Sequence, residues 1–318
     1  MTVRTVFRVA AGPRIGYGHL VRASVLGRAW AARPAVSLRG GAAARAAARS
    51  LGCRVLDESL LAAVRRLRPD LVVIDDPSPA EAAACCRAMR RAGVRVASVH
   101  DLGLGYCGAD LTIDGSVVHP RGLPPGRALV GPRFAILRED DRRTRVRRTP
   151  RSVLVALGGG PRATAAERLA LSIRRAHPAV AVRVAGGFGR GGSRPAPGGI
   201  TWIGPRKGLA GELARTDVAV VGGGVTLYEA CRTGTPAVGV AVVPAQRPTI
   251  TGFARLGAAR DGGSIRDLPR ALREVSRLIG SATLRTATAT AGRAVVDGRG
   301  AVRVAEALAG LAGRGRSL

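Results

Sequence analysis

The chain has 318 residues, of which 46% are hydrophobic, and this length and composition predict about two globular domains with full cores. Its formal charge of +30 resembles that of nucleic-acid binders, but every basic residue except Lys207 is arginine, the arginines are scattered through every predicted helix, and aromatic residues for base stacking make up only 3%. With the heavy use of alanine and glycine this composition is typical of a GC-rich coding bias, so we expect a preference for anionic substrates and no specific nucleic-acid partner.

Other classes of protein are disfavoured by what the sequence lacks. The five cysteines show no metal-ligand spacing, which predicts reduced, partly buried thiols and no metal site. The first residues are strand-like, so we expect no signal peptide, and no apolar run approaches the length of a membrane span. No G-x-G-x-x-G is followed by an acid about 20 residues on, so we expect no cofactor. We expect a cytoplasmic monomer.

Strand and helix patterns alternate through the first half of the chain. In order, the pattern predicts a strand at 3–10, helix 20–32, strand 36–38, helices 42–51 and 60–67, strand 71–74, helix 80–92, strand 94–99, and short strands at 110–113 and 128–130. Such βα alternation is typical of a parallel, doubly wound sheet.

The pattern stops in a polar stretch and then starts again. Residues 138–151 (REDDRRTRVRRTPR) contain a proline and lack periodicity, which predicts a linker. After it the pattern predicts strand 152–157, helix 164–176, strands 180–185 and 201–203, helix 209–215, strands 218–221 and 237–243, and closing helices, the last at 301–312.

The chain is therefore expected to form two Rossmann-like domains. We predict an N-terminal domain at 1–140, a basic linker at 141–151 and a C-terminal domain at 152–318 that includes the closing helices. Ligands of open α/β sheets bind beyond the carboxyl ends of the strands. Two such domains that face each other are expected to hold a nucleotide sugar in the cleft between them.

The segment 218–246 (VAVVGGGVTLYEACRTGTPAVGVAVVPAQ) carries the strongest functional signal. An apolar strand ends in the glycines 222–224, and a helix opened by Thr226 follows, with Glu229 one turn inside it. Glycines let a ligand approach the backbone, and a helix N-terminus offers N–H groups and a positive dipole end to a phosphate. Glu229 could accept hydrogen bonds from a ribose diol. The segment predicts a nucleotide site, although it is not a P-loop.

A reading without a ligand stays open for the same segment. Thr226-x-x-Glu229 is also the spacing of a capping box, which stabilises a helix start by itself. Glycine turns follow strands in α/β proteins of every function.

A second motif lies near the N-terminus, at 14–22 (RIGYGHLVR). Gly16 and Gly18 predict a tight loop that a ligand can approach, and His19 lies where the next helix begins. The helix dipole disfavours an imidazolium there, so we expect a neutral imidazole that can take a proton from water or a hydroxyl. The alternative is that His19 only caps the helix or packs against it.

These motifs resemble those of one family. Residues 15–22 (IGYGHLVR) resemble the IG-x-GH-x-x-R signature of the UDP-2,4-diacetamido-2,4,6-trideoxy-β-L-altropyranose hydrolases of pseudaminic acid biosynthesis, which are related to spore-coat polysaccharide proteins. Further blocks follow in the family's order across nearly the whole chain, at 71–76 (LVVIDD), 131–139 (GPRFAILRE), 153–159 (VLVALGG), 222–246 and 296–304 (VDGRGAVRV).

The resemblance implies a GT-B fold, with two Rossmann-like domains facing across a cleft and the nucleotide on the C-terminal one. It also implies hydrolysis of the sugar–phosphate bond of a UDP-sugar. His19 matches the family's catalytic histidine, the predicted base for water. The predicted substrate-binding residues are Gly16, Gly18, Arg22, Asp75 and Gln246, and the predicted nucleotide-binding residues are Gly159, Gly223, Gly224, Val225, Thr226 and Glu229. Because no metal is expected, we expect Arg14 or Arg22 to neutralise the charge of the diphosphate.

The chain departs from the family's pattern near the sugar. The family's Asp-(His/Tyr)-Tyr, Asn-Gln and Asp-Asp here read Asp75-Asp76-Pro77, Ala245-Gln246 and His100-Asp101. The Asp that usually precedes IG-x-GH is missing. These departures leave the sugar open and leave room for a changed reaction or a lost activity.

Three hypotheses follow. The first is a UDP-sugar hydrolase with His19 as base, active in surface-glycan biosynthesis. The second is a GT-B glycosyltransferase, in which a sugar or lipid acceptor replaces water. The third is an inactive nucleotide-sugar-binding homologue or a basic polyanion binder.

Overall fold

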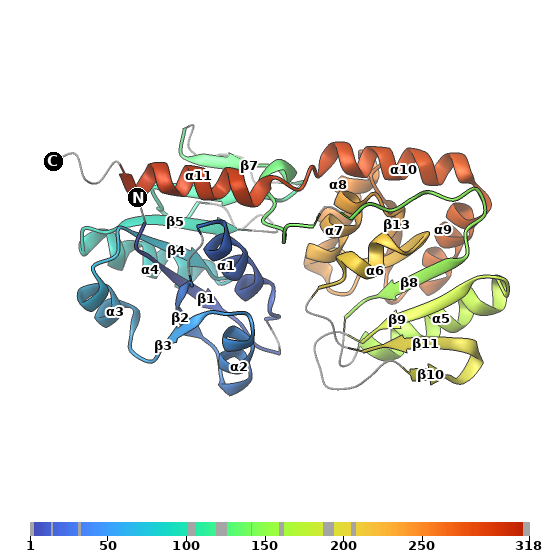
Figure 1. Ribbon diagram of the computed structural model, residues 1–318, viewed down its shortest axis with the longest axis horizontal. Coiled ribbons are helices and arrows are strands. Elements are labelled where there is room, and N and C mark those ends of the chain that lie inside the picture. Colours follow the sequence, from blue (N-terminus) through green and yellow to red (C-terminus); the bar gives the residue numbers. More distant parts are fainter. Residues whose placement is uncertain are drawn as a thin grey trace. The chain divides into compact units, whose positions relative to one another are not determined.

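The computed structural model describes residues 3–13, 15–30, 33–100, 106–118, 126–140, 142–158, 162–186, 194–204 and 208–313. The chain divides into two compact α/β units (Figure 1). Unit 1 contains Met1–Glu139 and Gly298–Leu318, and unit 2 contains Asp140–Asp297.

Unit 1 is built on a seven-stranded sheet in which every neighbouring pair of strands is parallel. The strand order is β3-β2-β1-β4-β5-β6-β7, the doubly wound order that the βα alternation predicts. Its elements are β1 (Thr5–Ala10), α1 (Gly18–Ala29), β2 (Ala35–Arg39), α2 (Ala42–Ser50), β3 (Arg54–Leu56), α3 (Leu60–Leu67), β4 (Leu71–Asp75), α4 (Pro79–Arg91), β5 (Arg95–His100), β6 (Leu111–Asp114), β7 (Ala128–Val130), the 3₁₀ turn η1 (Pro132–Phe134) and α11 (Gly300–Gly313).

Alternate residues of each central strand of unit 1 face opposite layers of helices. In β1, Phe7 and Val9 lie in one apolar cluster with residues of α1 and α11, whereas Val6 lies in the other with residues of α3 and α4. β4 follows the same alternation, so its strand-end residue Asp75 is directed to the layer that contains α1.

The last helix, α11, belongs to unit 1 and not to the predicted C-terminal domain. We expected α11 to close the C-terminal domain, but Ala301, Val304 and Leu308 are buried in the core of unit 1, and Trp30 donates its indole N–H to the Ala305 carbonyl at 3.3 Å. Figure 1 shows the helix beside α1. The apolar spacing of α11 reveals a buried face, but it does not reveal which sheet covers that face.

Gly300 allows the close approach of α11 to unit 1. A Cβ at this position would lie 2.2 Å from the backbone oxygen of Ala135 and 2.8 Å from its nitrogen. Because backbone atoms cannot rotate away, we expect Gly300→Ala to lower the free energy of unfolding of unit 1 by about 1–3 kcal/mol. Urea unfolding followed by circular dichroism measures the loss.

Gly310 in the same helix is the matched control for this substitution. It is exposed, and a Cβ there meets no atom within 4 Å. Gly310→Ala should leave stability unchanged or raise it by up to about 1 kcal/mol through helix propensity. Equal effects of the two substitutions would contradict the proposed clash.

Unit 2 has a second seven-stranded sheet, ordered β10-β11-β9-β8-β12-β13-β14, in which only β10 is antiparallel to its neighbour. Its elements are β8 (Ser152–Ala156), α5 (Ala163–Ala176), β9 (Ala181–Ala185), β10 (Arg194–Ala196), the 3₁₀ turn η3 (Pro197–Gly199), β11 (Ile200–Ile203), α6 (Ala210–Ala214), β12 (Val218–Gly222), α7 (Val225–Thr233), β13 (Ala237–Ala241), the 3₁₀ turn η4 (Pro244–Gln246), α8 (Arg247–Arg255), β14 (Arg260–Ser264), α9 (Leu268–Gly280) and α10 (Ala282–Val295).

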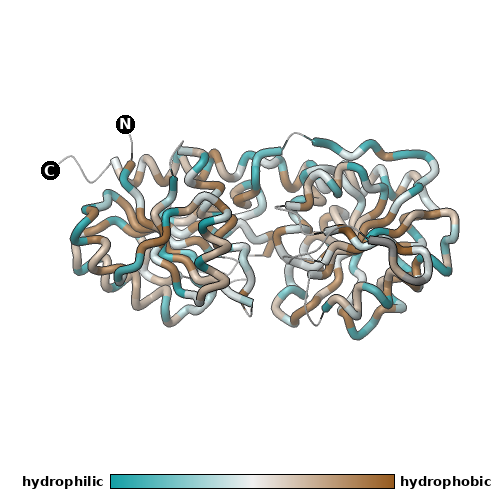
Figure 2. The backbone as a smooth tube through the Cα atoms, turned by 60° about the horizontal axis from the view of Figure 1, so that its bottom comes forward, coloured by the Kyte–Doolittle hydropathy of each residue, from teal (hydrophilic) through white to brown (hydrophobic). Residues whose placement is uncertain are grey.

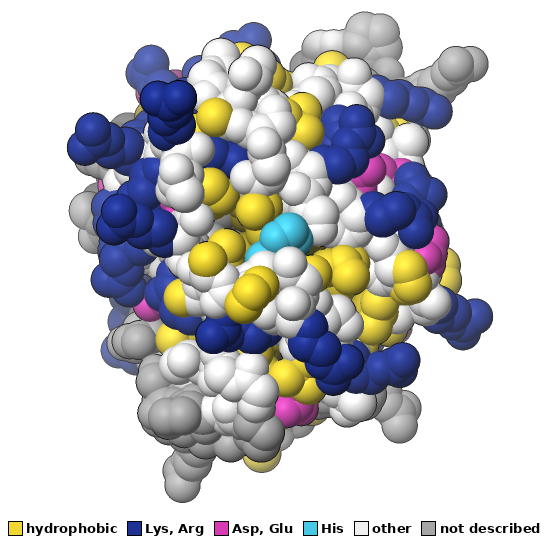
Figure 3. Space-filling model, turned by 90° about the vertical axis from the view of Figure 1, so that its right-hand side faces the viewer, with side chains coloured by type: hydrophobic (Ala, Val, Ile, Leu, Met, Phe, Trp, Pro, Cys, Tyr) yellow, Lys and Arg dark blue, Asp and Glu magenta, His cyan; other side chains and the backbone are white. Residues whose placement is uncertain are grey.

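The hydropathy of the chain follows this arrangement. Figure 2 shows hydrophobic stretches in the middle of each unit and hydrophilic stretches around them. None of the described helices is long and apolar enough to cross a membrane. On the face drawn in Figure 3, the described arginine side chains alternate with neutral and hydrophobic ones.

Candidate active site

The loop between β1 and α1 places His19 at the carboxyl end of the first strand. Gly12 and Gly16 pair across the loop through two backbone hydrogen bonds of 3.1 and 2.7 Å, and Gly16 has a φ of +94°, which favours glycine. The helix begins at Gly18, with His19 as its second residue. The prediction that His19 lies where the helix begins is confirmed, and no side chain caps that helix.

Three buried side chains form a cluster at this position. Asp75 ends β4, which pairs with β1 so that Val9 and Asp75 are neighbours. The Asp75 carboxylate lies 2.7 Å from Nδ1 of His19 and accepts hydrogen bonds from Nε and Nη2 of Arg22 at 2.8 and 2.6 Å. His19, Arg22 and Asp75 are only 8%, 7% and 2% exposed, so this cluster is largely shielded from water.

The partners of Nδ1 determine the tautomer of His19. Nδ1 lies 2.7 Å from Asp75 Oδ1 and 2.8 Å from Arg22 Nη2. A carboxylate only accepts a hydrogen bond and a guanidinium only donates one, so a protonated Nδ1 bonds to Asp75 and an unprotonated Nδ1 bonds to Arg22. We assign the Nδ1 proton to the bond with Asp75, because that bond is charge-assisted and Arg22 Nη2 already donates to the carboxylate. The Nε2 lone pair is then available to accept a proton.

The same neighbours keep Asp75 ionised. Burial by itself would raise the pKa of Asp75, but the positive charge of Arg22, the interaction with His19 and the hydrogen bonds from both hold the pKa of this carboxyl well below its usual range. An Asp75 that is ionised at neutral pH can orient the His19 ring and stabilise the imidazolium that forms when Nε2 takes a proton.

Arg22 and Asp75 lie together in this buried cluster. Both are predicted to bind substrate, and their charged groups are paired with each other and buried. Arg22 is three residues after His19, so the two side chains share one face of α1. That spacing is visible in the sequence and could have pointed to the cluster. Arg14, the other arginine considered for the diphosphate, lies outside the described residues.

The glycine loop of unit 2 is held by Gln246. Its Oε1 accepts hydrogen bonds from the backbone N–H groups of Gly223 and Val242, each at 3.1 Å. A Cβ on Gly223 would lie 2.9 Å from both Cβ and the backbone oxygen of Gln246, so this loop passes too close for any larger residue. The N–H of Gly223, one of the predicted nucleotide-binding residues, is thus engaged within the protein.

The helix after this loop begins one residue before the predicted opening. Gly224 is the N-cap of α7, with no side-chain cap, and Thr226 is already the second helical residue. A capping box built on Thr226 is therefore wrong, because that motif needs the threonine at the N-cap. Glu229 is 8% exposed on the same helix. Gly159, the remaining nucleotide-binding prediction, lies outside the described residues.

Replacing Gln246 tests its part in holding the loop. Gln246→Ala removes the shared acceptor and leaves two backbone N–H groups without a partner, so we expect a loss of about 1–3 kcal/mol in the free energy of unfolding. Gln246→Glu keeps an acceptor oxygen of the same reach and should lose much less. Urea unfolding of both variants measures the difference, and equal losses would contradict this role for the amide oxygen.

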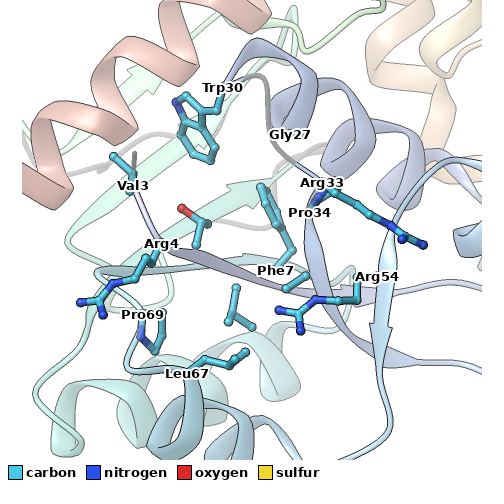
Figure 4. A pocket seen from close by; sticks show the side chains of 13 residues that line it. Val3, Arg4, Phe7, Gly27, Trp30, Arg33, Pro34, Arg54, Leu67 and Pro69 are labelled. Atoms are coloured by element: carbon cyan, nitrogen blue, oxygen red, sulfur yellow. The ribbon is translucent and has the colours of Figure 1, made fainter. Parts of the chain in front are cut away.

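The cavity drawn in Figure 4 lies at the amino ends of the strands of unit 1, at the opposite end of the sheet from the candidate site. It has a volume of about 240 Å³ and opens beside the first residues of β1 and β2, with Phe7 and Trp30 on its wall. Ligands of open α/β sheets bind at the carboxyl ends of strands, and no predicted site residue lines this cavity. It is therefore separate from the candidate site. Among the described residues, no group of three or more acidic, histidine or cysteine side chains is arranged to hold a metal.

Comparison with known proteins gives one similar sequence. No family model matches the chain. Over 98 residues the chain is 38% identical to the spore coat polysaccharide biosynthesis protein SpsG of Bacillus subtilis (strain 168), a match that spans 30% of this chain and 29% of that protein. The match supports the resemblance to spore-coat polysaccharide proteins, while the hydrolase family remains a prediction.

Solved structures match along nearly the whole chain. MurG of Acinetobacter baumannii is 16% identical with a TM-score of 0.69, and covers 96% of this chain and 99% of its own. The spinosyn rhamnosyltransferase SpnG, complexed with thymidine diphosphate, is 14% identical with a TM-score of 0.68, and covers 97% of this chain and 99% of its own. The chain therefore has the GT-B fold, built from two parallel-sheet Rossmann-like domains, as the sequence predicted.

Proposed function

We propose that the protein transfers a glycosyl group from a nucleoside diphosphate sugar to an acceptor hydroxyl, with His19 as the general base. The observation that carries this proposal is the His19–Asp75 pair, buried at the carboxyl end of β1 with the Nε2 lone pair unclaimed by Asp75. The GT-B fold supports it, since glycosyltransferases are among the solved structures similar to this chain.

In the proposed reaction His19 activates the acceptor. Nε2 removes the hydroxyl proton as that oxygen bonds to the anomeric carbon, and the bond from this carbon to the diphosphate breaks, so that the nucleoside diphosphate leaves with the electron pair. Asp75 stabilises the imidazolium, and Arg22 keeps Asp75 ionised. Asp75 and Arg22 thus act as positioning residues.

We assign nucleotide binding to the glycine loop and the start of α7. Gly224, Val225 and Thr226 lie at a helix N-terminus without a side-chain cap, which suits a diphosphate. We propose that Glu229 accepts hydrogen bonds from the ribose diol. Gly223 and Gln246 are proposed to shape the loop, because the amide oxygen of Gln246 is already bonded to it. We propose UDP as the leaving group, a cytoplasmic site of action and a place in polysaccharide biosynthesis.

Hydrolysis is the second candidate. The IGYGHLVR motif resembles that of UDP-sugar hydrolases of pseudaminic acid biosynthesis, and a buried His–Asp pair can activate water as well as a hydroxyl. In this case the free amino-deoxy sugar and UDP are the products, and no acceptor is needed.

Calorimetry with UDP and dTDP, with AMP and CMP as controls, tests the nucleotide site at about 0.15 M salt and at higher salt. Selective binding of a pyrimidine diphosphate that survives the higher salt supports the proposal. Binding that lacks selectivity and disappears at higher salt would indicate a basic polyanion binder and contradict it.

Release of the diphosphate from a panel of sugar nucleotides then separates the activities. A rate that depends on an added acceptor supports transfer, and an equal rate in water alone supports hydrolysis. Selective binding without turnover of any sugar nucleotide, with or without acceptor, would indicate an inactive homologue, and both enzymatic proposals would be withdrawn.

A further inference from the structure

Two cysteines from different elements of unit 1 are in direct contact. The sulfur of Cys86, in α4, lies 3.1 Å from that of Cys107, in the segment between β5 and β6. Both thiols are reduced in the structure. A disulfide bond is about 2.05 Å long, so the sulfurs need to approach by only roughly 1 Å to become bonded.

The two thiols differ in access and in charge. Cys86 is 1% exposed, whereas Cys107 is partly exposed. The hydrogen bond with Cys86 lowers the pKa of the Cys107 thiol, burial opposes this shift, and interactions with His100 and Ser98 lower the pKa further. The same contact and burial raise the pKa of the Cys86 thiol.

His100 is positioned to support this pair. It ends β5, is 4% exposed, and its Nε2 lies 2.8 Å from Oγ of Ser98. Ser98 and His100 point to the α4 side of the sheet, as alternate residues of one strand. His100 also interacts with the Cys107 thiol.

The remaining cysteines lack these properties. Cys53 and Cys231 are 0% and 1% exposed, and burial raises the pKa of both thiols. Burial also raises the pKa of Cys85. A reactive cysteine needs a stabilised thiolate and access from solvent, and Cys107 is the one that has both.

We propose that Cys86 and Cys107 are a redox-modified pair, which hydrogen peroxide converts to a reversible intramolecular disulfide with Cys107 as the attacking thiolate. Cys107 sulfur bonds to one peroxide oxygen, the O–O bond breaks, and the other oxygen leaves as hydroxide and takes up a proton to form water. The Cys86 sulfur then attacks the sulfenic acid, the S–S bond forms, the S–O bond breaks, and the second water leaves with the remaining protons. Each sulfur loses one electron and the peroxide gains two.

The test is mass spectrometry of the full chain. The protein is treated with hydrogen peroxide or with dithiothreitol, unfolded, and alkylated with iodoacetamide. We expect peroxide to remove two alkylatable thiols and to join the tryptic peptides 67–87 and 96–121, and dithiothreitol to restore both. The bond closes a loop of about 20 residues, so the thermal midpoint of the oxidised protein should rise by several degrees. If Cys86 and Cys107 are alkylated to the same extent with and without peroxide, the proposal is wrong.

Two variants assign the reacting thiols. Cys85→Ser removes the sequence neighbour of Cys86 from the same peptide and should leave the cross-link in place. Cys86→Ser should stop the reaction at sulfenic acid on Cys107, which dimedone traps. A cross-link that is lost in Cys85→Ser, or dimedone labelling on a cysteine other than Cys107, would overturn the assignment. The wild-type experiment stands even if a variant fails to fold.

Discussion

Replacing His19 with alanine is expected to lower turnover of the sugar nucleotide by about 10²–10⁴-fold, the usual contribution of a general base. Nucleotide affinity should change little, because the residues proposed to bind the nucleotide belong to unit 2 and His19 belongs to unit 1. Steady-state kinetics with the substrate found in the release assay gives kcat, and calorimetry with UDP gives Kd.

His177 supplies the matched control. It is a histidine of unit 2 whose Nε2 lies 2.7 Å from Oγ of Ser276, so it has a hydrogen-bonded partner but no place in the candidate site. His177→Ala should leave kcat within about twofold of the wild type. Unchanged turnover in His19→Ala would show that another group is the base, and the proposed mechanism would be withdrawn.

Asp75→Asn should impair both activity and stability. The substitution leaves the buried guanidinium of Arg22 without its counter-charge and removes the group that fixes the His19 tautomer. Breaking a buried ion pair on one side costs about 3–5 kcal/mol, and turnover should fall by roughly 10²–10⁴-fold. Urea unfolding and steady-state kinetics measure the two effects.

The neighbouring residue Asp76 is the control for this substitution. Asp76 is also 2% exposed and directly follows β4, but its partner Arg39 has a side chain that is 34% exposed and can turn to water. Asp76→Asn should therefore lose less stability and leave kcat nearly unchanged. Equal losses of activity in the two variants would indicate a general effect on the carboxyl end of β4, not a role of Asp75 in orienting His19.

The lowered pKa of Asp75 also fixes how the stability difference depends on pH. The folded pKa lies below the unfolded value of about 3.9, so the ionised carboxylate stabilises the folded state fully above that value, and the contribution is lost as pH falls toward the folded pKa. The difference in unfolding free energy between wild type and Asp75→Asn should be constant from pH 7 down to about pH 5 and shrink below about pH 4. A difference that grows in acid would contradict the pairing.

The sequence predicts strands well where they are apolar and poorly where they are not. The central strands β1, β4, β8, β12 and β13 are apolar and rich in valine, and their positions are confirmed within a few residues. β14 reads Arg-Asp-Gly-Gly-Ser and was missed. Its Gly262 lies so close to β13 that a Cβ would be 2.6 Å from Val238, so this strand uses glycine where propensity disfavours it.

The candidate site was predictable in its residue types but not in their pairing. His19, Asp75 and Arg22 stand out as polar residues at a helix start and a strand end. Whether the Asp75 side chain contacts substrate or His19 depends on the face of the sheet to which it points, and on the pairing of β4 with β1. The Gly223 bond to Gln246 joins residues 23 positions apart through a backbone N–H, for which a sequence gives no signal.

The return of α11 to unit 1 has a consequence for the order of folding during synthesis. Residues 300–313 complete the apolar cluster on the α1 side of the unit 1 sheet, whose other members are made before residue 140, so the ribosome must translate all of unit 2 before this cluster can be completed. Unit 2 is one continuous stretch of the chain, so its core does not depend on a segment that is made later. The half of the chain that is made first is therefore expected to be the last to become protease-resistant on the ribosome, and to be the part that chaperones hold longest.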